Sequence, residues 1–167
     1  MIQRIQSVFL FLLVVAMVAM LFLPLWSKTD AVTSETVVLS AWNLKSTILN
    51  DEGAPTGAGT LPERGTFAIG LLALAAAAIA AYEIFQYKSR LSQMKLGLLN
   101  TLVLSALIGT TLYYALYVGS DMVQSNDNNG AYHSGFYMPL LALLLNALSN
   151  RFIKRDEDLV RSVDRLR

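Results

Sequence analysis

The sequence predicts an all-α membrane protein in which four transmembrane helices form one bundle. Three observations support this fold class. The 167-residue chain is 54% hydrophobic and 15% charged, whereas soluble domains are about 45–50% apolar and about 25% charged. Long uncharged runs occur four times along the chain, and lysine and arginine are concentrated in alternate connections between them. The composition also excludes intrinsic disorder, which requires low hydrophobicity and high charge.

The uncharged runs are long enough to span a bilayer. The first, residues 5–27, would form roughly 34 Å of helix, and a hydrocarbon core is about 30 Å thick. This run exceeds the apolar region of a signal peptide, usually about 7–15 residues, and no A-x-A cleavage site follows it. We therefore expect it to be retained. The expected transmembrane helices cover about 5–26, 66–87, 96–119 and 135–153.

The distribution of basic residues predicts the orientation. Ten lysines and arginines lie before the first run, between the second and third runs, and after the fourth run, whereas three lie in the other two connections. Cytoplasmic segments carry the excess of positive charge. Both termini are therefore expected in the cytoplasm, with outer loops at 27–64 and 120–134 and a cytoplasmic tail at 154–167.

The first outer loop has the composition of strands followed by turns. Residues 33–44, TSETVVLSAWNL, are rich in β-branched and aromatic types, and residues 50–65 are rich in turn formers. We expect a small β-hairpin lying over the bundle, with Trp42 packed on the bundle or on the lipid headgroups. A lone hairpin is marginal in water, so the helix ends would have to support it.

The tail, RFIKRDEDLVRSVDRLR at 151–167, is expected to be helical. Two interpretations remain open: a solvated extension of the fourth helix, or an amphipathic helix that lies on the inner leaflet or docks on a partner. Arginine offers planar, bidentate hydrogen bonds that lysine cannot copy. Candidate partner contacts are Trp42, Arg161, Asp164 and Arg165.

Three polar residues within the expected helices are candidate functional positions: Glu83, Asn100 and Asn146. Glu83 is the only ionisable one, and its simplest role is an interfacial ion pair with Arg90, Lys95 or Arg4. Asn100 and Asn146 are expected to form interhelical hydrogen bonds.

The sequence predicts no catalytic site. There is no cysteine and one histidine, and no GxSxG, HExxH or phosphate-binding motif occurs. We therefore expect no enzyme activity, cofactor, metal, nucleic acid or small-molecule substrate. The leading hypothesis is a non-enzymatic accessory or scaffold subunit of a membrane complex, whose partners are the lipid bilayer and other membrane-protein subunits. The alternative is a small transporter or channel component that uses Glu83 and Asn100.

Four segments together resemble a known family: MIQRIQ at 1–6, PLW at 24–26, YEIFQYKSRLSQMKLGLLN at 82–100 and IKRDEDLVRSVDRLR at 153–167. The chain resembles, over essentially its whole length, a family of small bacterial inner-membrane proteins that is catalogued as a domain of unknown function with four predicted transmembrane helices. The resemblance implies a bacterial origin and a location in the cytoplasmic membrane. It implies no activity and no catalytic residue.

Overall fold

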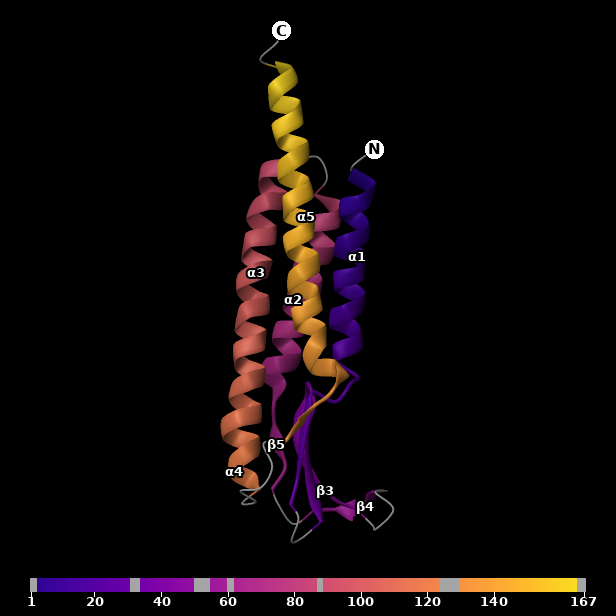
Figure 1. The fold of residues 1–167 in the computed structure, drawn as a ribbon, viewed down its shortest axis with the longest axis vertical. Helices are drawn as coiled ribbons and strands as arrows, with labels where there is room; N and C mark the ends of the chain where they lie inside the picture. The colour runs from indigo at the N-terminus through magenta and orange to yellow at the C-terminus, as the bar shows by residue number, and fades with distance from the viewer. Residues whose placement is uncertain are drawn as a thin grey trace.

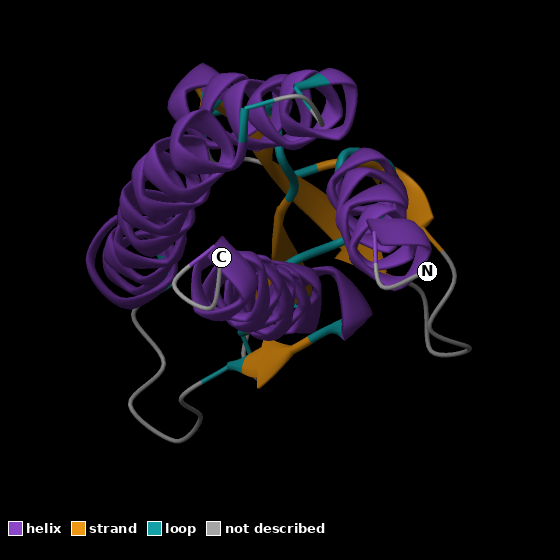
Figure 2. Cartoon of the chain, turned by 90° about the horizontal axis from the view of Figure 1, so that it is seen from above, coloured by secondary structure: helices purple, strands orange, loops and turns teal. Residues whose placement is uncertain are grey.

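The computed structural model describes residues 3–30, 34–49, 55–59, 62–86, 89–123 and 130–164. Long helices stand side by side, and a β-sheet lies beyond one end of them (Figure 1). Seen end-on, the helices surround the centre of the molecule, with strands behind them (Figure 2). The first helix begins and the last helix ends at the end of the bundle away from the sheet (Figure 1).

The bundle is built from α1 (Gln3–Met20), α2 (Phe67–Phe85), α3 (Arg90–Tyr113) and α5 (Ser134–Asp164). A π-helical segment, η1 (Tyr114–Gly119), and a short α4 (Ser120–Met122) continue α3 without a break. Among the described residues, three helical stretches are long and apolar enough to cross a membrane: Phe67–Phe85, Leu91–Met122 and Ser134–Asp156. The apolar part of α1, Ile5–Met20, is shorter.

The first apolar run does not stay helical to residue 26. α1 ends at Met20, and the chain then passes through Pro24 into the sheet. Proline has no backbone N–H and is disfavoured inside a helix. The next N–H, that of Leu25, donates to the carbonyl oxygen of Leu39 at 2.8 Å. The last residues of the first apolar run therefore lead into the first strand of the sheet.

The sheet has six antiparallel strands: β1 (Trp26–Thr29), β2 (Glu35–Leu39), β3 (Asn43–Leu49), β4 (Pro55–Ala58), β5 (Arg64–Gly65) and β6 (Ala131–Tyr132). Their order is β4-β3-β2-β1-β6, and β5 pairs with the start of β3 beside β4. β6 comes from the connection that precedes α5, and it pairs with Trp26 and Ser27 of β1.

The prediction of an all-α bundle with one small hairpin is therefore wrong. The first loop contributes five strands and the second contributes a sixth. The physical reason is the weakness of a two-stranded hairpin in water, because three or more strands with an apolar face are needed for stability. Val37, Leu39 and Leu44 supply such a face and are fully buried. The tail is part of α5, which runs unbroken to Asp164.

The helices pack through small and apolar side chains. Alanines 73, 76, 77 and 80 of α2 are buried, and such small residues let neighbouring backbones approach closely. The outer faces are apolar as well. On α1, Val8, Phe11 and Val15 are each about half exposed, at 54%, 60% and 48%. Extended exposed apolar surface marks contact with a membrane or with a partner.

Two tryptophans join the sheet to the bundle. Trp26 is fully buried against Gly119 of η1, where a Cβ atom would lie 2.6 Å from the indole ring. Trp42, in the turn between β2 and β3, lies against Gly70 of α2 in the same way, at 2.6 Å. Backbone hydrogen bonds strengthen the second junction, because the N–H of Thr66 donates to the carbonyl oxygen of Trp42 at 2.9 Å.

Candidate functional site

Polar side chains are buried in the apolar helix bundle, and we call them the polar core. The polar core consists of Glu83 of α2, Gln93 and Asn100 of α3, and Asn146 and Ser149 of α5. All five are at most 4% exposed. Buried polar groups in apolar surroundings are costly and therefore mark candidate functional positions.

One face of α3 organises the polar core. Gln93, Gly97, Asn100 and Thr101 follow the spacing i, i+4, i+7 and i+8, which brings them to the same side of a helix. The Asn146 amide nitrogen donates across to this face, to the Gly97 carbonyl oxygen at 2.8 Å and to the Thr101 hydroxyl oxygen at 2.9 Å. These bonds join α3 to α5 on both sides of Asn100.

Glu83 of α2 is next to Gln93 of α3. The Gln93 side-chain nitrogen donates to the Glu83 backbone carbonyl oxygen at 3.1 Å. The Glu83 carboxyl oxygens have no hydrogen-bond partner within the described ranges. Lys95, one of the expected ion-pair partners, is exposed. The side chains of Arg4 and Arg90 lie outside the described part of the chain.

Asn100 is fully buried, and neither its side-chain oxygen nor its nitrogen has a hydrogen-bond partner among the residues that the structure describes. The same holds for the Asn146 side-chain oxygen and the Ser149 hydroxyl. The polar core therefore retains hydrogen-bonding capacity that this part of the chain does not use. A proton, a cation or a polar group of a partner could use it.

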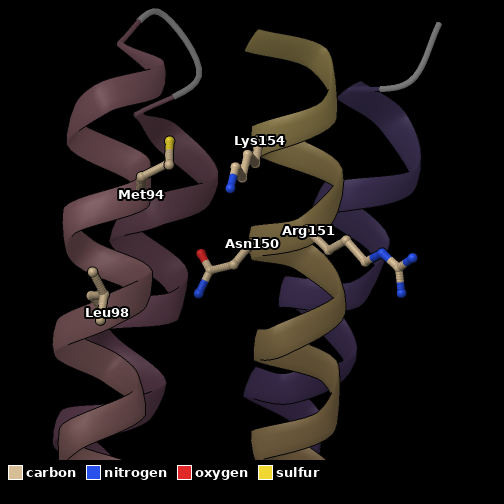
Figure 3. A pocket seen from close by; sticks show the side chains of 5 residues that line it. All are labelled: Met94, Leu98, Asn150, Arg151 and Lys154. Carbon is tan, nitrogen blue, oxygen red and sulfur yellow. The ribbon is translucent and has the colours of Figure 1, made fainter. Parts of the chain in front are cut away.

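A cavity of about 300 Å³ opens beside the polar core, between α3 and α5. It is lined by Met94, Leu98, Asn150, Arg151 and Lys154. Figure 3 shows Asn150 and Lys154 reaching from α5 toward α3, whereas the guanidinium of Arg151 points away from α3. The Asn150 amide lies against Gly97, at the place where a Cβ atom would stand.

Comparison with known protein families shows to which family the chain belongs. Residues 2–166 match the family described as domain of unknown function (DUF4293). The chain belongs to this family. A comparison with curated proteins gave no match. The family membership of this DUF4293 protein therefore brings no assigned activity, and its chemistry has to be argued from the residues themselves.

Glu83 is the one carboxyl group in the polar core of the DUF4293 protein. Within the described ranges, no three side chains of His, Cys, Asp or Glu gather at one place. Its groups are one carboxyl, several amides and a hydroxyl, which can form hydrogen bonds or hold a single proton or cation.

The candidate partner contacts lie far apart in the DUF4293 protein. Trp42 is half-buried, and its ring lies against Gly70 of α2. Arg161 and Asp164 lie in the last turns of α5, and the described part of the structure does not include their side chains. Arg165 lies outside the described residues.

Sequence reasoning did not single out Gln93, Ser149 or Asn150. One signal could have found the last two, because Asn146, Ser149 and Asn150 follow the spacing i, i+3 and i+4 and therefore share a helix face. Gln93 stands seven residues before Asn100, which is two helical turns. Polar residues repeated at helical spacing within an apolar run indicate an interior face.

Proposed function

We propose that this protein is a non-enzymatic, four-pass protein of the bacterial cytoplasmic membrane, and that it acts as an accessory or scaffold subunit of a membrane complex. In this proposal both termini are cytoplasmic and the sheet is extracytoplasmic. Along the sequence, ten of the thirteen lysines and arginines lie before the first apolar run, between the second and third runs, or after the fourth run. The described parts of these segments lie at the end of the bundle away from the sheet. That asymmetry supports the orientation through the positive-inside rule. The partners would be the lipid bilayer and other membrane-protein subunits.

The α1 helix requires a separate argument, because 18 residues span only about 27 Å. Its lipid-facing candidates, Val8, Phe11 and Val15, are as apolar as the outer faces of the longer helices. A short hydrophobic helix is accommodated by local thinning of the bilayer at modest cost. These properties support a fourth membrane pass.

The sheet is the observation that carries the scaffold proposal. It is joined to the helix ends through Trp26 and Trp42, so a partner bound to it would be held in a fixed position relative to the bundle. Its outer strand β4 is exposed at residues 56–58. An edge strand presents free backbone groups that can pair with a strand of another chain.

The test is co-purification of tagged full-length protein in several mild detergents. The proposal expects a stoichiometric partner identified by mass spectrometry. Gly57→Lys would place a charge on the β4 edge in open space, since no atom lies within 4 Å of a Cβ atom there. This variant should lose the partner. Ala131→Lys, at the opposite edge and also exposed, should keep it. A solitary, monodisperse species in every detergent would refute the scaffold role.

The second candidate function is a small transporter or channel component that uses Glu83 and Asn100. Its specific support is that both residues are fully buried in the bundle and that their polar side-chain atoms have no hydrogen-bond partner within the described ranges. In proteoliposomes, Glu83→Gln should then reduce ion or substrate flux, whereas Glu63→Gln, at an exposed position beside the sheet, should not. Absence of flux in the unmodified protein would eliminate this candidate.

A further inference from the structure

We propose that the cavity between α3 and α5 binds an anionic phospholipid, with the phosphate held by Lys154 and Arg151 and the start of an acyl chain lying against Met94 and Leu98. The proposal requires that α3 and α5 cross the bilayer. It does not require that the protein act as a scaffold.

The charge of the cavity favours an anion. Two of its five lining residues, Arg151 and Lys154, are cationic, and none of the five is acidic. They are three residues apart on α5, so they are neighbours on one helix surface. Both side chains are exposed, and exposed side chains change rotamer rapidly. A change of rotamer would turn Arg151 from the orientation in Figure 3 toward a phosphate beside Lys154.

The basic and apolar residues that line the cavity are arranged along the bundle axis in the order that a lipid headgroup and its acyl chain require. α3 begins and α5 ends at the end of the bundle away from the sheet, so Lys154 lies nearer that end than Asn150 and Met94 lies nearer it than Leu98. Under the proposed orientation that end is cytoplasmic. A headgroup at Lys154 would lie at the inner surface, and its acyl chain would extend past Leu98 into the hydrocarbon. Basic pockets between helices on the cytoplasmic side are known sites for anionic headgroups.

Asn150 adds a polar contact within the cavity. Asn150 lines the cavity on the hydrocarbon side of Lys154, which is where the ester groups of a lipid would lie. Its side-chain nitrogen can donate a hydrogen bond to an ester carbonyl oxygen. The cavity volume of about 300 Å³ matches the lower limit of typical ligand pockets, so it accommodates part of a lipid while the rest extends into the bilayer.

The experiment uses full-length protein that has been purified in dodecyl maltoside and depleted of lipid. Thermal unfolding is followed while phosphatidylglycerol, phosphatidylcholine or inorganic phosphate is added. Phosphatidylglycerol should raise the unfolding midpoint in a saturable way, and the other two should not. An equal rise with phosphatidylcholine would overturn the anionic specificity. An equal rise with inorganic phosphate would overturn the assignment to a lipid.

Matched variants locate the site. Arg151→Gln combined with Lys154→Gln should weaken phosphatidylglycerol binding by about tenfold or more, because two cations beside the phosphate are lost. Arg155→Gln is the control, since Arg155 is exposed on the same helix and does not line the cavity. It should leave the affinity unchanged. Equal weakening by the control would mean that only overall charge matters and would refute the site.

Leu98→Trp tests the apolar half of the cavity without changing its charge. Leu98 is 65% exposed, so the larger side chain can be accommodated without disturbing the bundle. It should fill the space next to Met94 and reduce phosphatidylglycerol binding. Unchanged binding would overturn the placement of the acyl chain. Neither result depends on recovery of a protein partner, so the lipid site and the scaffold role can fail separately.

Discussion

The indole ring of Trp26 lies directly against Gly119, although the two residues are separated by most of the chain. Trp26 begins β1 and Gly119 ends η1, so this contact connects the sheet to the third helix of the bundle. Lys28, two residues further along β1, makes a parallel connection, because its ammonium donates to the Val123 carbonyl oxygen at 3.2 Å. A cation at the end of a helix is favourable, since unpaired carbonyl groups gather there.

We expect Gly119→Ala to destabilise the protein by about 1–3 kcal/mol, the usual cost of forcing extra atoms into a packed core. The new Cβ atom would lie 2.6 Å from the indole ring, so the ring or the helix would have to move. Thermal unfolding in detergent measures the effect. Gly109→Ala is the matched control, because a Cβ atom there has open space and alanine is the better helix former. A stability loss in the control as large as that of Gly119→Ala would contradict the steric explanation.

Asn146→Leu should lower stability by about 0.5–2 kcal/mol, because it removes the bonds to Gly97 and Thr101 that join α5 to α3. Asn100→Leu makes the same chemical change at a buried site whose amide has no hydrogen-bond partner within the described ranges. It should be neutral or stabilising, since an unsatisfied polar group is removed. Unfolding midpoints of both variants in the same detergent provide the comparison. The reverse order of stabilities would refute the assigned roles.

Reporter fusions test the orientation. A reporter active only outside the cytoplasm should function when fused within residues 50–60 or 125–130, because these segments belong to the connections that carry three of the thirteen basic residues. The same reporter should be inactive when fused at residues 90–93 or after residue 167. A cytoplasmic reporter at each site provides the complementary control. The opposite pattern of activity would overturn the proposed orientation and, with it, the cytoplasmic position of the lipid site.

Truncation after Asp156 should leave membrane insertion intact and reduce recovery of a partner. It keeps the four apolar helices and the cavity residues, but removes Arg161 and Arg165. Arg161→Lys combined with Arg165→Lys keeps the charge and loses bidentate hydrogen bonding, so it should have an intermediate effect. Membrane abundance and partner recovery are measured together. If truncated and full-length protein are equally abundant and equally well assembled, the tail makes no partner contact.

The sequence predicted the long apolar helices, but it did not predict which residues they contact. The runs that become α2, α3 and α5 are visible in the printed sequence because hydropathy is a property of neighbouring residues. The partners of Asn146 were not visible. Gly97 accepts its hydrogen bond through a backbone oxygen, and every residue has one. The close approach of α5 to α3 at Gly97 determines which backbone oxygen Asn146 reaches.

By itself the sequence determined that the chain has long apolar helices, that β-branched residues follow the first of them, and that positive charge gathers on alternate connections. The tertiary structure decided that Trp26 belongs to a strand and that Ala131 pairs with Ser27. It also decided that the loops form a six-stranded sheet in place of one hairpin. The physical reason is the range of the interactions. Helix hydrogen bonds join residues four apart, whereas strand pairing joins residues whose proximity depends on the rest of the fold.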